Sequence, residues 1–344
     1  MKKASNDSLV DVVIPWVDCN DARWIKERAK YSNCCNNSEG NNDARFRDWN
    51  TLKYVFRSLY EYAPWINRIY LVTSGQIPDW LNIDNSKIKV IDHKDFIPDA
   101  YLPTFCANAI ELNLHRIKGL SEQFIFLNDD IILINKTSKK QFFKKGLPCD
   151  TAVLNTHCGW KSRLIYNIAF NDTAIINEHY KFKEVISNSK KNWFNYKYGI
   201  KNNLQNLILL NCPRFPGFKQ FHMANSFLKS SYEYLWDLET EEFTNTCMDK
   251  FRNKNHINQW LIREYQLVSN NFIPTKKYKM GIMIDFEKDG EEKAIKKCEK
   301  YLFNSKYKMM CINDGDSIKN YLLLKNKINE LLEKKFPNKT PYEK

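Results

Sequence analysis

An amide followed by two carboxylates is the strongest chemical signal in the sequence. Asn128, Asp129 and Asp130 come directly after the apolar run 124–127. Paired carboxylates at the end of a strand can hold a divalent cation, which in enzymes that use nucleotide-sugars bridges the diphosphate oxygens and neutralises charge on the leaving group. A polar turn that simply closes the strand is the alternative interpretation.

A second acidic cluster, Asn313, Asp314, Gly315 and Asp316, lies near the other end of the chain. If the chain folds back, its carboxylates could complete the coordination shell of the same cation. An Asx turn would account for these residues without any metal, and the spacing does not decide between the two.

Polar residues also follow the first apolar run, 9–17. Asp18, Asn20 and Asp21 could bind ribose, uracil or a metal, or they could cap the helix that comes next.

Two basic side chains complete the set of candidate catalytic groups. His222 follows a turn rich in Pro and Gly and is the best-placed general base, although a lone histidine is more often structural. Arg47 stands between Arg45 and Asp48, where its guanidinium could clamp a phosphate while Asp48 caps a helix. A surface salt bridge is the alternative for this second group.

These residues need a scaffold that brings them together. Short apolar runs at 9–17, 68–73, 87–92 and 123–127 predict strands, and 50–61 has apolar residues at helical spacing. Strands that alternate with helices predict an α/β fold with a Rossmann-like, mostly parallel sheet. Ligands collect at the carboxyl ends of such strands, so the loops that carry Asp18, Thr73 to Gln76, and Asn128 to Asp130 are expected to share one crevice.

The rest of the chain has less regular patterning. Three parts are predicted: a nucleotide-sugar-binding part, a basic and mainly helical insertion, and a helical part that completes the site and ends in a basic tail. Their ranges are 8–138, 139–214 and 215–344, with helices expected at 227–267, 293–301 and 318–334.

The amino-acid composition limits the class of protein and the partners that it is expected to bind. Hydrophobic residues make up 43% of the chain, which indicates a folded protein, and the formal net charge of +13 favours anionic partners. The sequence has no apolar run long enough to span a bilayer and no apolar N-terminal stretch, so a cytoplasmic location is expected. The ten cysteines include no CxxC pair, which argues against a zinc cluster and against a disulfide framework.

Taken together, the motifs resemble the Stealth family, which includes bacterial capsule phosphotransferases and the catalytic core of lysosomal-enzyme GlcNAc-1-phosphotransferase. Four signatures appear in order, with Cys19 where glycine is common and Ala224 in place of a usual proline. The matching segments are 11–21; 45–48 with 62–65, 72–81, 102–105, 114–117 and 127–130; 221–224 with 258–260; and 311–314.

The resemblance implies a GT-A-like form of the Rossmann-like sheet and a set of residue roles. Mg2+ or Mn2+ would be held by Asp129, Asp130 and Asp314, with Asn313 in the same shell. His222 would contact the acceptor hydroxyl and Arg47 the diphosphate, so that His222, Asp130 and Arg47 form the catalytic group. The substrate-binding residues would be Asp18, Asn20, Asp48, Thr73, Gln76, His115, Arg116 and Asn128.

The reaction implied is transfer of hexose-1-phosphate, with N-acetylhexosamine-1-phosphate favoured, from a UDP-sugar to a sugar hydroxyl. A phosphodiester in a capsular or surface glycan would form and UMP would leave. The alternatives are a metal-dependent glycosyltransferase that releases UDP, and a non-enzymatic basic protein that binds nucleic acid or a membrane.

The expected partners are a UDP-sugar donor and a glycan acceptor, with no nucleic acid. The basic insertion and the tail from Lys325 are expected, on charge alone, to hold either an anionic growing polymer or the inner membrane face, the latter by peripheral association. The oligomeric state, the sugar and the acceptor hydroxyl stay open.

Overall fold

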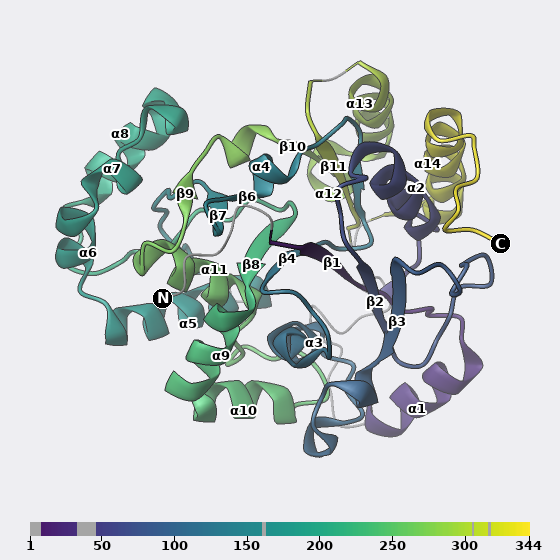
Figure 1. Ribbon diagram of the computed structural model, residues 1–344, viewed down its shortest axis with the longest axis horizontal. Coiled ribbons are helices and arrows are strands. Elements are labelled where there is room, and N and C mark those ends of the chain that lie inside the picture. The colour runs from purple at the N-terminus through teal and green to yellow at the C-terminus, as the bar shows by residue number, and fades with distance from the viewer. Residues whose placement is uncertain (1–7, 33–45, 160–162, 305, 316–317) are drawn as a thin grey trace.

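The computed structural model describes residues 8–32, 46–159, 163–304, 306–315 and 318–344 (Figure 1). Arg45 and Asp316, which the sequence analysis singled out, lie outside these ranges. Within the described residues, no helix combines the length and the apolar character needed to cross a membrane.

A five-stranded sheet with the order β3-β2-β1-β4-β8 forms the centre of the molecule. The first four strands in this order are parallel and β8 is antiparallel to β4, which confirms the predicted α/β fold with a mostly parallel, Rossmann-like sheet. The strands are β1 (Val10–Pro15), β2 (Ile69–Thr73), β3 (Ile88–Asp92), β4 (Gln123–Phe126) and β8 (Asn225–Leu228).

Alternate residues of the strands enter two separate cores, because successive side chains of a strand point to opposite faces. Val12 and Ile14 pack with α2 (Leu52–Tyr62) and the C-terminal elements, whereas Val13 packs with aromatic residues on the other face. Helices therefore cover both faces, as the uniformly apolar strands require (Figure 1).

A second sheet, β10-β11-β5, lies beside α2 and was not predicted from the sequence. β10 and β11 are parallel and β5 pairs antiparallel with β11. This sheet joins residues about 180 positions apart, which no local pattern reveals. The strands are β5 (Ile131–Leu133), β10 (Gly281–Asp285) and β11 (Met309–Asn313).

Helices dominate the remaining chain. The region 164–209 is mainly helical, and its helices extend to one side of the body in Figure 1. The prediction of helix from Phe227 was wrong at its start, because Phe227 lies in β8 and its helix begins at Lys229. These helices are α5 (Leu164–His179), α6 (Phe182–Asn188), α7 (Lys190–Trp193), α8 (Gly199–Leu209), α9 (Lys229–Leu238), α10 (Thr240–Met248) and α11 (Gln259–Val268).

The C-terminal segment is an integral part of the fold. Arg57, buried in α2, donates from Nε and Nη2 to the two carboxylate oxygens of Glu343, at 2.9 and 2.8 Å. Its Nη1 also donates to the carbonyl oxygen of Phe336. The basic stretch after Lys325 is therefore anchored to the body.

The remaining helices and strands are α1 (Ala22–Ser32), α3 (Ala107–Leu112), α4 (Lys139–Phe142), β6 (Phe143–Lys144), β7 (Leu147–Asp150), β9 (Ile273–Pro274), α12 (Phe286–Asp289), α13 (Glu291–Phe303), α14 (Tyr321–Lys335) and the 3-10 helix η4 (Leu114–Arg116).

Candidate active site

The carboxyl ends of β1 and β4 lie side by side at the centre of the main sheet, since the two strands are parallel neighbours. Asp18 follows β1, and Asn128, Asp129 and Asp130 follow β4. This edge is where a doubly wound sheet offers a ligand crevice. The strand-end acids thus occupy the position that the sequence pattern predicts.

The fourth signature reaches the same edge through the second sheet. Cys311 in β11 pairs with Ile131 in β5, directly after Asp130. The backbone N–H of Ile312 donates to the carbonyl oxygen of Asp130 at 2.9 Å, and the thiol of Cys311 donates to its Oδ2 at 3.3 Å. Asn313, at the end of β11, lies in register with Asp285 of β10.

His222 arrives from a third direction. Its loop leads into β8, and because β8 is antiparallel to β4, Asn225 at the start of β8 pairs with Phe126 at the end of β4. One ligand atom each from Asp130, His222 and Cys311 lie within 4.8 Å of one another. His222 is exposed and Cys311 is buried, so the cluster has one open side.

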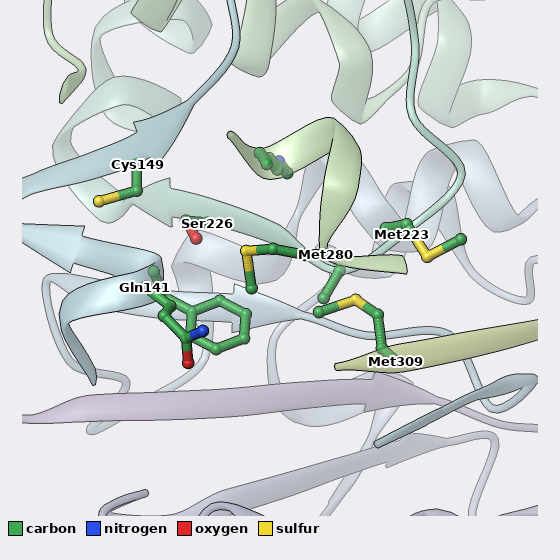
Figure 2. A pocket seen from close by; sticks show the side chains of 9 residues that line it. Gln141, Cys149, Met223, Ser226, Met280 and Met309 are labelled. Carbon is green, nitrogen blue, oxygen red and sulfur yellow. The ribbon is translucent and has the colours of Figure 1, made fainter. Parts of the chain in front are cut away.

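A small apolar cavity lies behind the His222 loop and is lined by the thioethers of Met223, Met280 and Met309 (Figure 2). A β-carbon at Gly281 would lie only 2.0 Å from Sδ of Met223. The absence of a side chain at Gly281 therefore allows Met223 to pack here, next to His222 in the chain.

The protein does not fully compensate the negative charge of the Asp129 and Asp130 carboxylates. Desolvation by the surrounding protein, together with the charges of Asp130 and Asp48, raises the pKa of Asp129 to about 8. Desolvation also raises the pKa of Asp130, while His222 and the thiol of Cys311 oppose that rise. Both side chains keep some contact with solvent, yet Oδ1 of Asp130 is buried and accepts no hydrogen bond from any described residue.

A divalent cation fits this donor set. It would offset the two closely spaced carboxylates, and it would occupy the lone pairs that the protein leaves unused on Asp130. Carboxylate oxygens are also the ligands that Mg2+ and Mn2+ favour. Asp129 and Asp130 are thus suited to hold the metal.

Arg47 and Asp314 bind each other at the rim of the site. The guanidinium donates from Nε to Oδ2 and from Nη2 to Oδ1 of Asp314, both at 3.0 Å, and from Nη2 to the carbonyl oxygen of Gly315 at 2.9 Å. Its carbon lies 5.0 Å from the ring centre of Tyr321. The resemblance implied separate roles for these two residues, on the diphosphate and the metal, whereas the structure pairs them.

Asp48 lies close to Asp18 and beneath α14. Desolvation raises the pKa of Asp48 and the charge of Asp18 adds to this, while Lys325 acts in the opposite direction. The Tyr321 hydroxyl and the Lys325 ammonium both donate to the carbonyl oxygen of Asp48 at 2.6 Å. The C-terminal helix thereby fixes the segment that carries Arg47.

Gln76 and Thr73 shape the loop after β2. The Gln76 carboxamide bridges the backbone of Asp18, accepting from its N–H at 3.0 Å and donating to its carbonyl oxygen at 2.9 Å. The buried Thr73 hydroxyl donates to the carbonyl oxygen of Gln76 at 2.8 Å. The exposed Asn20 donates its N–H to Oδ1 of Asp18 at 2.8 Å. Gln76 and Thr73 therefore position Asp18, since their polar groups bond within the protein.

The structure does not bring His115 and Arg116 to this site. They lie in η4, which leads into the amino end of β4, whereas the acids follow its carboxyl end. The His115 ring stacks on Tyr232 at 5.8 Å, and Arg116 lies 4.6 Å from the ring centre of Trp236. Burial and the Arg116 charge lower the pKa of His115 to about 3. Their position indicates a packing role in place of the substrate-binding role implied for them.

Sequence reasoning missed four residues of the site. Cys311 stood within a matching segment but was assigned no role, and Trp49, Tyr321 and Lys325 gave no local signal. The Trp49 ring packs edge-on against the ring of Tyr321, with the ring centres 5.2 Å apart. Only contacts across more than 180 positions reveal these residues.

Comparison with known proteins gives the family. The protein-family model for Stealth protein CR2, conserved region 2, matches residues 45–149 of this chain. The capsular polysaccharide phosphotransferase WcwK of Streptococcus pneumoniae is 37% identical, covering 98% of this chain and 99% of its own length. The exopolysaccharide phosphotransferase cps2G of Lactiplantibacillus plantarum is 38% identical, covering 97% and 96%.

A solved structure of the galactosyltransferase LgtC, with donor and acceptor sugar analogs, aligns over 94% of this chain and 95% of its own. Its identity of 10% and TM-score of 0.39 are too low to carry an argument about this site. The sequence relatives, in contrast, match nearly end to end at more than a third identity. The chain therefore belongs to the Stealth family of phosphotransferases.

Proposed function

We propose that the protein transfers hexose-1-phosphate, with N-acetylhexosamine-1-phosphate favoured, from a UDP-sugar to a sugar hydroxyl. The product is a phosphodiester within a capsular or other surface polysaccharide, and UMP is released. The relatives named as polysaccharide phosphotransferases support this reaction class. The observation that carries it is the meeting of Asp130, His222 and Cys311, from three distant segments, at the carboxyl edge of the sheet.

His222 acts as the general base in this proposal. It takes the proton from the acceptor hydroxyl while that oxygen forms a bond to the β-phosphorus of the donor. The bond between the β-phosphorus and the oxygen bridging it to the α-phosphorus breaks, and its electron pair leaves with UMP. The bond at the anomeric carbon stays intact. The exposure of His222, beside the partly buried acids, supports an acceptor that enters from solvent.

Asp129 and Asp130 hold the metal, Mg2+ or Mn2+. When bound, the cation neutralises charge on the diphosphate and on the departing phosphate. Asp314 and Asn313 stand at the end of β11 and would complete the polar surroundings of this site.

Arg47 faces the diphosphate while Asp314 keeps it in place. The described contacts of Arg47 engage Nε and Nη2, so Nη1 can still donate to a phosphate oxygen. The donor lies over the strand-end loops, near Asp18, Asn20, Asp48 and Asn128. The reaction is placed in the cytoplasm, as the sequence predicts.

Nucleotide release tests the proposal. The purified protein is incubated with Mg2+ or Mn2+, a panel of UDP-sugars and short glycan acceptors, and UMP is separated from UDP. We expect UMP that depends on both metal and acceptor. Release of UDP would replace the proposal with glycosyl transfer.

The base is tested in the same assay. His222→Asn is expected to lower kcat by about 10²- to 10⁴-fold. His179→Asn serves as the matched control, because His179 lies at the end of α5, where its ring pairs with Glu239. Near-normal turnover by His222→Asn would remove His222 from the mechanism.

A further inference from the structure

Helix α8 has an inverted distribution of side chains. Its inward face carries Asn202 and Asn206, both buried, and its outward face carries aliphatic residues. Asn206 donates to the carbonyl oxygens of Ala152 and Trp193 and accepts from the N–H of Leu154. Amide hydrogen bonds to backbone therefore hold this helix in place, where apolar contacts usually would.

The outward face of α8, together with Tyr196 just before the helix, forms an apolar stripe, which we define as Tyr196, Ile200, Leu204, Leu207 and Ile208. The exposed fraction of these side chains runs from 52% for Leu204 to 89% for Ile200. At about 100° per residue the four aliphatic positions share one arc about 100° wide. A contiguous patch of this kind marks a surface that another apolar phase covers.

Basic residues surround the stripe. Residues 181–214 contain seven basic side chains and one acidic side chain, Glu184. Lys190, Lys191 and Lys201 are exposed, and Lys201 borders the arc next to Ile208 on the helical wheel. An exposed apolar face with flanking lysines is the pattern of helices that lie in the interface of an anionic bilayer.

A second copy of the chain fits this surface less well. A two-fold contact sets the same patch of both copies against each other, which would bring the two cationic borders together. An anionic surface offsets these charges, whereas a self-contact concentrates them.

We propose that the α8 stripe docks the protein on the surface of a bilayer that contains anionic phospholipids. The arm α6 to α8 lies at the side of the molecule, away from α14 (Figure 1). The first residue of α8 is linked to the His222 loop through Tyr278: a β-carbon at Gly199 would lie 3.0 Å from Oη of Tyr278, whose ring lies 6.3 Å from that of Phe221, the residue before His222. Docking through α8 therefore holds the loop of His222 near the bilayer surface.

Vesicle co-sedimentation of the full chain tests the proposal. The probes are vesicles of phosphatidylcholine mixed with phosphatidylglycerol, and vesicles of phosphatidylcholine alone. We expect sedimentation with the mixed vesicles and weaker sedimentation with the neutral ones. The combined change Ile200→Ser, Leu204→Ser and Ile208→Ser should weaken binding at least about tenfold. Wild-type protein that stays in the supernatant with mixed vesicles would overturn the proposal.

Control variants on α14 and α1 test whether binding depends on the α8 stripe and its lysines or only on the overall hydrophobicity and charge of the protein. Leu322 and Leu323 are also exposed but lie on α14, so Leu322→Ser with Leu323→Ser should bind like wild type. Reversal of Lys190, Lys191 and Lys201 to Glu should weaken binding on the order of 100-fold, while Lys26→Glu with Lys30→Glu on α1 should have much less effect. Circular dichroism and nucleotide release with a soluble acceptor check that each variant is folded. Two results would contradict the proposal. One is unchanged vesicle binding by both the triple serine variant and the triple glutamate variant when both are folded. The other is a wild-type protein that binds no vesicles but forms a dimer, which the serine variant dissociates.

Discussion

Two aspartates of this molecule stand in opposite electrostatic situations. Asp150 is fully buried, yet it receives Nε and Nη2 of Arg263, both at 2.9 Å, and Nζ of Lys277 at 3.3 Å. Burial would raise its pKa, but Arg263 and Lys277 outweigh that effect and hold it at about 2. Asp130 keeps one oxygen without a partner among the described residues, and its pKa is raised.

The difference separates structural from functional carboxylates. The protein supplies every partner that Asp150 needs, so this residue stabilises the junction of β7 and α11. It leaves the buried Oδ1 of Asp130 without a hydrogen bond from any described residue, and a buried carboxylate oxygen without a partner is costly unless a ligand binds it. This contrast supports the proposed role of Asp130 in the reaction and assigns Asp150 to stabilising the fold.

Asp130→Asn is expected to give the largest effect on activity. Loss of the charge should reduce kcat/KM by about 10²- to 10³-fold or more, because the cation and the departing phosphate lose a compensating anion. Thermal unfolding should show equal or higher stability, since an amide avoids the cost of a desolvated charge. Marked destabilisation together with near-normal kcat/KM would break the comparison.

Asp150→Asn should behave in the opposite way. Removing this charge leaves Arg263 and Lys277 buried without their anion, which costs about 3–5 kcal/mol of unfolding free energy. Urea unfolding followed by fluorescence measures that loss. A stability within about 0.5 kcal/mol of wild type would show that Asp150 is not a structural anchor.

A third acid, Glu264, extends the comparison to the pH dependence of stability. Burial raises the pKa of Glu264 to about 8, although the charge of Arg263 opposes this, and the buried Asp172 is shifted in the same direction by burial and by Glu264. The folded state thus binds a proton that the unfolded state releases near pH 4.5. Stability should fall as pH rises from about 4.5 through about 8.

Glu264→Gln tests this sign. Its amide replaces the protonated carboxyl, which accepts from Gln220 at 2.8 Å and from Thr173 at 3.2 Å. Unfolding curves at a series of pH values should show a smaller decline for the variant than for wild type. An equal decline would assign the pH dependence to other groups.

The sequence predicted the local parts of this picture and missed the distant ones. Strands such as β2 and β4 were predicted within a residue or two, because short and largely apolar runs rich in β-branched and aromatic residues are typical of strands buried on both faces. The pairing of β11 with β5 could not be predicted, since residues 131 and 311 meet only in the fold. The same reason explains why Cys311, Tyr321 and Lys325 were not assigned to the site.

Residue types also failed to say which way a side chain faces. His115 and Arg116 are chemically able to bind a substrate, but their strand connection places them at the amino edge of the sheet. Arg47 and Asp314 were both predicted as site residues, yet no sequence pattern indicated that two residues 267 positions apart bind each other. For α8, the apolar stripe was visible only once Asn202 and Asn206 were seen to face inward.

The central claim, transfer of the sugar together with its phosphate, is tested most directly by following the β-phosphorus of the donor. A UDP-sugar labelled at that atom is incubated with the protein, the metal and a glycan acceptor, and the label is then located. The account predicts labelled glycan and unlabelled UMP, with Asp130→Asn greatly slowing both. Label that remains on released UDP while the glycan gains only the sugar would contradict it.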